Sequence, residues 1–142
     1  MKYHSIFLPL LPITVTALFS CNEDQNAFPA RAGKFVVHYT SVRDENLDGQ
    51  PWIRICLPSP NGDFTDVSPL NVPCNEGPPV RFPYDQTKLE HTLIVTNGNG
   101  CDEDSSNLDG ARMEYDGQKR DLSGEDEGCG KRSHGISCEF TL

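Results

Sequence analysis

The sequence predicts a small all-β domain, an antiparallel β-sandwich or barrel of about six strands stapled by disulfides. Three observations predict this fold class. Apolar and polar residues alternate in several short runs, Asn-Gly and Asp-Gly pairs lie between the runs, and no segment has apolar residues at the spacing of an amphipathic helix. A chain of 142 residues has room for one such domain.

Alternating side chains define the expected strands. In the first of them, Phe35, Val37 and Tyr39 share one face, and Val36 and His38 share the other. This period of two is typical of a strand with one face toward a core. The expected strands span residues 34–42, 51–57, 80–84, 89–96, 111–115 and 136–142.

Segments rich in glycine and proline are expected to connect the strands. Asn or Asp followed by Gly supplies the positive φ angles that tight turns need. A proline-rich stretch, residues 58–79, is expected to form a long irregular connection. Asn-Gly and Asp-Gly pairs lie at residues 48–49, 61–62, 97–98, 109–110 and 116–117, among others.

The N-terminal residues are expected to direct export and to lie outside the fold. Lys2 supplies a positive charge, and the apolar run 6–19 follows it, interrupted by prolines. A short apolar run behind a basic residue is typical of a secretory signal peptide, and this one is too short for a spanning helix. We therefore expect a secreted, extracellular protein. Its expected parts are a signal peptide at 1–20, an N-terminal segment at 21–33 and one disulfide-bonded β domain at 34–142.

Several cleavage sites fit this N-terminal region. Signal cleavage after Ala17 or after Ser20 satisfies the preference for small residues. The Leu-Phe-Ser-Cys motif that ends at Cys21 also resembles the box of bacterial lipoproteins, in which the cysteine carries lipid. A lipid-anchored extracellular β domain is therefore an alternative. The Phe-Pro-Ala-Arg motif that ends at Arg31 resembles the processing sites of Kex2-type proteases in fungal secreted proteins.

The six cysteines predict disulfides. Their number is even, none forms a C-x-x-C motif, and an exported chain meets an oxidising environment. Six cysteines allow 15 pairings, and the sequence does not choose among them. If Cys21 is removed or lipidated, one thiol is left over. Pairing neighbours that close loops, and then the two ends, gives Cys56 with Cys74, Cys101 with Cys129, and Cys21 with Cys138.

The formal charge of −9 excludes several classes of partner. A nucleic-acid-binding protein needs a basic face to meet phosphates, and so does a protein that coats anionic lipid. We therefore expect neither nucleic acid nor membrane as a partner, unless Cys21 carries lipid. The expected state is a monomer.

Residues 102–127 are the most acidic part of the chain, with 10 acidic and 3 basic residues. Acidic triplets lie just inside Cys101 and Cys129, and a bridge between these cysteines would bring the triplets together. The resulting repulsion favours a basic partner or a weakly held cation, and a solvated acidic surface is the alternative. The candidate partner-binding residues here are Asp102, Asp104, Glu125 and Asp126.

Trp52 is the only tryptophan, and it shares an expected strand face with Arg54 and Cys56. A lone tryptophan is expected to pack in the core or against a disulfide. If it is exposed, Trp52 and Arg54 together have the composition of a binding hot spot. Both residues are therefore candidate partner-binding residues.

The sequence contains no enzyme signature. A G-x-S-x-G elbow, a phosphate-binding loop and a dinucleotide-binding glycine motif are all absent. We therefore expect a protein without catalytic residues, cofactor or bound metal. A small secreted hydrolase or nuclease is the alternative, and it would require His38, Glu90 and Arg112 to converge.

The layout as a whole resembles the small secreted cysteine-rich proteins of plant-associated filamentous fungi, the class that includes effectors and avirulence proteins. The resemblance rests on the signal peptide, the motif that ends at Arg31, the even number of cysteines and the short all-β domain. It implies a protein that is released into the host apoplast or translocated into host cells. It also implies that the protein binds a host component, such as a plant receptor or target, without catalysis.

Overall fold

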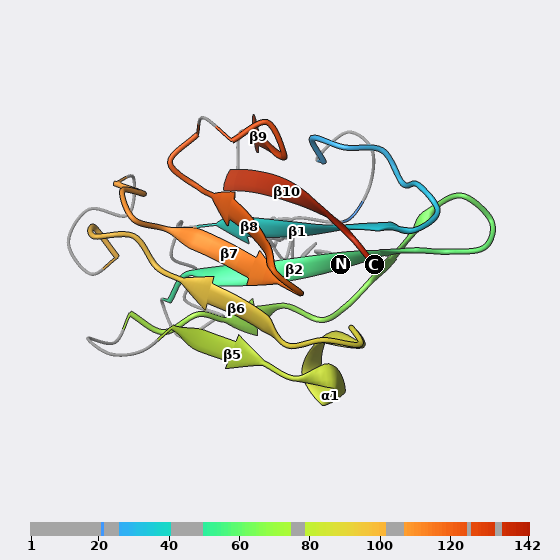
Figure 1. Cartoon of the computed structure of the whole chain (residues 1–142), viewed down its shortest axis with the longest axis horizontal. Coiled ribbons are helices and arrows are strands. Elements are labelled where there is room, and N and C mark those ends of the chain that lie inside the picture. Colours follow the sequence, from blue (N-terminus) through green and yellow to red (C-terminus); the bar gives the residue numbers. More distant parts are fainter. Residues whose placement is uncertain are drawn as a thin grey trace, which may run out of the picture.

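The computed structural model describes residues 21, 26–40, 50–74, 79–101, 107–124, 126–132 and 135–142. Within these residues the chain forms two antiparallel sheets that pack face to face as a sandwich (Figure 1). The strands are β1 (Lys34–Thr40), β2 (Trp52–Pro58), β3 (Phe64–Asp66), β4 (Leu70–Asn71), β5 (Val80–Phe82), β6 (Leu93–Thr96), β7 (Arg112–Tyr115), β8 (Gln118–Asp121), β9 (Cys129–Arg132) and β10 (Gly135–Thr141).

The larger sheet has the strand order β3-β2-β1-β10-β9, and the short β4 also pairs with β2. Its three long strands, β2, β1 and β10, each have 7 residues and lie at its centre. The first and last strands of the domain are therefore neighbours, with Phe35 opposite Phe140 and His38 opposite Ser137. This pairing closes the domain, because its two ends meet in the middle of one sheet.

The smaller sheet has the order β5-β6-β7-β8, in which each strand pairs with the next along the chain. Asp116 and Gly117 connect β7 to β8 with φ angles of 46° and 75°. Two successive positive φ angles are those of a type I′ hairpin turn, the turn expected for an Asp-Gly pair. The smaller sheet is therefore a meander built from local turns.

One apolar core lies between the two sheets. Phe35 stacks on Phe140 with ring centroids 5.3 Å apart, and it meets the edge of Tyr115 at 4.8 Å. The smaller sheet contributes Leu93, Val95 and Met113, among other side chains, to the same core. Since side chains alternate along a strand, these core residues leave their neighbours on the outer faces of the sandwich.

The sequence predicted the class of fold, and it underestimated the number of strands. All six expected strand regions contain a strand, but β3, β4, β8 and β9 were not expected. Two of them, β3 and β4, are short pieces inside the proline-rich connection at 58–79. The region 89–96 is a strand only from Leu93, because a helical turn, α1 (Tyr84–Thr87), and Lys88 with φ of 62° precede it.

The disulfide pairing differs from the expected one. All six cysteines are paired, as Cys21 with Cys56, Cys74 with Cys101, and Cys129 with Cys138. Participation of every cysteine is thus confirmed, and each of the three expected pairs is wrong. Cys129 and Cys138 lie opposite each other on β9 and β10, so their bridge follows from a strand pairing that the sequence did not reveal.

Candidate functional site on the outer face of the larger sheet

The outer face of the larger sheet carries an unusual mixture of side chains. Val36 and His38 from β1, Trp52 and Cys56 from β2, and Ser137 from β10 are all at most 5% exposed, although they point away from the main core. Polar and apolar groups are therefore buried together on this face. We regard it as the candidate functional site, because a sandwich needs no second buried layer for its fold.

Residues 21 and 26–33 contribute to the cover over this face. Phe28 packs against the buried cluster of Cys21, Val36, Trp52 and Cys56, and the Asn26 amide donates a hydrogen bond to the Cys56 Sγ atom at 3.5 Å. The Arg31 guanidinium binds both carboxylate oxygens of Glu139, its Nε donating to Oε2 at 3.2 Å. Cys21 and residues 26–33 are thus part of the folded unit.

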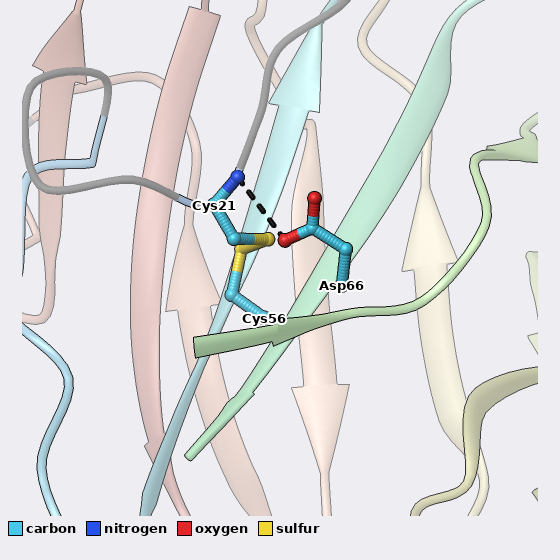
Figure 2. A group of neighbouring side chains, drawn as sticks. All are labelled: Cys21, Cys56 and Asp66. Carbon is cyan, nitrogen blue, oxygen red and sulfur yellow. Dashed lines mark hydrogen bonds between the residues drawn. A yellow bond between two sulfur atoms is a disulfide. The ribbon is translucent and has the colours of Figure 1, made fainter. Parts of the chain in front are cut away.

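Cys21 anchors this cover at the other end. Its disulfide to Cys56 ties it to the middle of β2, and the side chain of Cys21 is only 8% exposed (Figure 2). Its backbone nitrogen donates a hydrogen bond to Oδ1 of Asp66 at 3.2 Å, which Figure 2 shows as a dashed line. Asp66 lies opposite Cys56 in the pairing of β2 with β3, so strand register places the three residues together.

Sulfur and carboxylate groups this close resemble a metal-binding set. The ligand atoms of Cys21, Cys56 and Asp66 all lie within 4.8 Å of one another. Metal binding requires thiolates, however, and here the two sulfurs are bonded to each other. In the oxidised protein Asp66 is therefore left as an acceptor of hydrogen bonds and ion pairs.

Arg54 is the second donor to Asp66. Its Nη1 lies 3.1 Å from Oδ2, and the two side chains are 13% and 38% exposed. The Nε atom of Arg54 is buried and has no hydrogen-bond partner among the described residues. Arg54, a candidate partner-binding residue, therefore acts first within the protein, by holding β3 against β2.

His38 is fully buried beside Trp52. Its Nδ1 lies 2.9 Å from the Ser137 hydroxyl, across the pairing of β1 with β10. The His38 and Trp52 rings are 6.3 Å apart and tilted. Trp52 is 5% exposed, so its expected packing against the disulfide side of the sheet is found, and it offers little surface to a partner.

The acidic loop is only partly described. Asp102, Asp104 and Glu125 lie outside the described residues. Asp126 is described, and its carboxylate accepts the backbone N–H groups of Asp121 and Gly128 at 3.0 and 2.8 Å. Asp126 therefore organises its own loop. The expected meeting of the two acidic triplets depended on a bridge between Cys101 and Cys129, and these cysteines have other partners.

The residues proposed for the catalytic alternative do not converge. His38 faces the outer side of the larger sheet, whereas Arg112 lies on β7 of the smaller sheet and alternates with the core residue Met113. Glu90 is exposed in the connection before β6. The two strand residues are therefore on opposite outer faces of the sandwich.

Asp66 and Glu139 were missed by sequence reasoning, although each binds an arginine on this face. Asp66 belongs to β3, which is hidden in the proline-rich connection. Glu139 alternates with the apolar residues of β10 and lies on the face opposite the core, yet it is only 9% exposed. Neither carboxylate could be assigned to an arginine from the sequence, because the strand order brings Asp66 to Arg54 and Glu139 to Arg31.

Comparisons with protein-family models, curated proteins and solved structures gave no match. The described part of the chain has no helix long and apolar enough to cross a membrane.

Proposed function

We propose that this chain is a secreted, effector-like protein that acts by binding a host component during plant colonisation, without catalysis of its own. The observation that carries the proposal is the complete pairing of six cysteines in a small β-sandwich. Disulfides form and persist outside the cytosol, and small secreted domains use them to supplement a limited core. The apolar residues behind Lys2 supply a route to that environment.

The bond at Cys21 favours this proposal over a lipid anchor. A lipoprotein carries its lipid as a thioether on the N-terminal cysteine, and the Cys21 sulfur is bonded to Cys56. The same disulfide leaves no odd thiol in the domain. The chemistry at Cys21 therefore suits a protein that is released.

The partner is expected to be basic. The chain has a formal charge of −9, and Asp109, Asp116 and Glu127 in connecting segments and Asp121 at the end of β8 are exposed. Acidic surfaces steer basic partners and repel acidic ones, and salt screens this attraction. Trp52 contributes through the stability of the outer face, because it is buried.

A saturation binding experiment tests the proposal. The oxidised protein, labelled with a fluorophore, is applied to apoplastic wall and membrane fractions from host leaves, with unlabelled protein as competitor. We expect saturable binding that weakens as salt rises. The control is the same protein after reduction and alkylation, which should bind without saturation. Non-saturable binding of the oxidised protein would contradict the proposal.

A further inference from the structure

The carboxylate of Asp66 can bind two positively charged groups, one at each oxygen. The structure shows one of them, the Arg54 guanidinium. Its Oδ2 accepts a hydrogen bond from the Arg54 guanidinium at 3.1 Å, and its Oδ1 accepts one from the Cys21 backbone nitrogen at 3.2 Å. Among the residues that the structure describes, each carboxylate oxygen thus has one donor, one charged and one neutral. A charged donor in the second position would make a stronger hydrogen bond with the same geometry.

The neutral donor, the Cys21 backbone nitrogen, would become a charged α-ammonium group if signal cleavage occurred directly before Cys21. The Leu-Phe-Ser-Cys motif permits cleavage between Ser20 and Cys21. Cys21 is held by its disulfide to Cys56, so the nitrogen stays beside Asp66 whatever precedes it. Cleavage after Ala17 would leave a neutral amide at this position. Cleavage after Arg31 would leave residues 21–31 attached through the disulfide.

We propose that the export segment is removed before Cys21 and that the new α-ammonium group of Cys21 forms an ion pair with Asp66. A protease of the signal-peptidase class adds water across the Ser20–Cys21 peptide bond. Ser20 retains the carboxylate, and the Cys21 nitrogen takes up protons to become the ammonium. The inference rests on the export step of the proposed function.

The ion pair would complete the closure of the outer face. The Cys21 terminus, Asp66 and Arg54 would alternate in charge along one edge of the sheet, where β3 meets β2. Asp66 is 38% exposed, so the pair is partly screened by solvent and its contribution to stability is modest. Its main effect is to fix the terminus at the point where the covering segment begins.

Mass spectrometry of the protein secreted by a fungal host tests the cleavage. We expect an N-terminal peptide that begins at Cys21, is joined by disulfide to the Cys56 peptide, and carries a free α-amine that reductive dimethylation labels. Secreted protein that begins at Leu18 would overturn this inference and leave export intact. Protein retained in cells with residues 1–20 attached would overturn both.

A double-mutant cycle tests the ion pair itself. D66N is made in the protein that begins at Cys21 and in one that carries a neutral Gly-Ser-Gly-Ser extension before Cys21, which moves the ammonium away. We expect D66N to lower Tm by about 2–4 °C more in the first protein than in the second. An equal decrease in both would overturn the ion pair.

The matched control is D63N. Asp63 is an exposed carboxylate in the turn that leads to β3, so its neutralisation changes the net charge by the same amount a few residues away. We expect D63N to lower Tm equally with and without the extension. A difference as large as that for D66N would show a general charge effect and overturn the specific pairing.

Discussion

The two faces of the larger sheet are built from the same strands by different means. On the inner face, Phe35 and Phe140 stack within one continuous apolar core. On the outer face, His38 forms a hydrogen bond with Ser137, and the Cys21–Cys56 disulfide is buried in one cluster with Trp52. The inner face is stabilised by burial of apolar surface, and the outer face is stabilised by individual hydrogen bonds and a disulfide.

The two faces of the larger sheet are covered by different parts of the chain. Local alternation places the inner residues, and the opposite sheet buries them. The outer face takes its cover in part from a segment upstream of β1, which is tied down at Cys21 and again where Arg31 binds Glu139. We therefore expect packed apolar side chains to stabilise the inner face, and the Cys21–Cys56 bridge and the Arg31–Glu139 ion pair to hold the N-terminal segment on the outer face.

Truncating the inner face should have the largest effect. Phe35→Ala removes a fully buried ring that contacts Phe140 and Tyr115, and we expect it to cost about 3–5 kcal/mol of unfolding free energy. Phe28→Ala on the covering segment removes a half-buried ring and should cost about half as much. Urea unfolding measures both, and equal costs would contradict the contrast between the faces.

The loss of unfolding free energy on removal of a disulfide should increase with the length of the loop that the disulfide closes. The Cys21–Cys56 bridge has a sequence separation of 35, and the Cys129–Cys138 bridge has one of 9. From chain entropy we expect C21A/C56A to cost about 4 kcal/mol and C129A/C138A about 2.5 kcal/mol. Unfolding in urea without reductant measures this, and the reverse order would show that strand pairing matters more than loop length.

Raising the pH should weaken the inner face through Tyr39. Burial raises the pKa of Tyr39 from 10.0 to about 12, while its hydroxyl donates to Asn97. The unfolded chain then loses this proton near pH 10, before the folded chain does, so stability falls between pH 10 and 12 by roughly 2–3 kcal/mol. Tyr39→Phe should have a flatter profile of Tm against pH in this range. Parallel profiles would contradict the prediction.

Removing one hydrogen bond of the outer face should have the smallest effect. Ser137→Ala deletes the hydroxyl 2.9 Å from His38 Nδ1 and should cost about 1–2 kcal/mol, because both groups are buried. The exposed Ser68→Ala is the control and should lie within about 0.5 kcal/mol of the parent protein. Thermal unfolding compares them, and equal Tm values for the two variants would sink the prediction.

The inner face was predictable because its signal is local. Alternation at Phe35, Val37 and Tyr39 reports burial without knowledge of strand order, and the Asp116-Gly117 turn is encoded by two adjacent residues. The outer face was less predictable because its contacts join distant segments. His38 meets Ser137 only because β1 pairs with β10, and Asp66 meets Cys21 only because β3 pairs with β2.

Cys21 belongs to the folded domain, and its disulfide to Cys56 fastens the cover of the outer face. Proteolysis of the oxidised protein without reduction, followed by mass spectrometry, tests this placement of Cys21. We predict linked peptides for Cys21 with Cys56, Cys74 with Cys101, and Cys129 with Cys138. A peptide that links Cys56 to Cys74, or a lipid adduct on Cys21, would contradict the account.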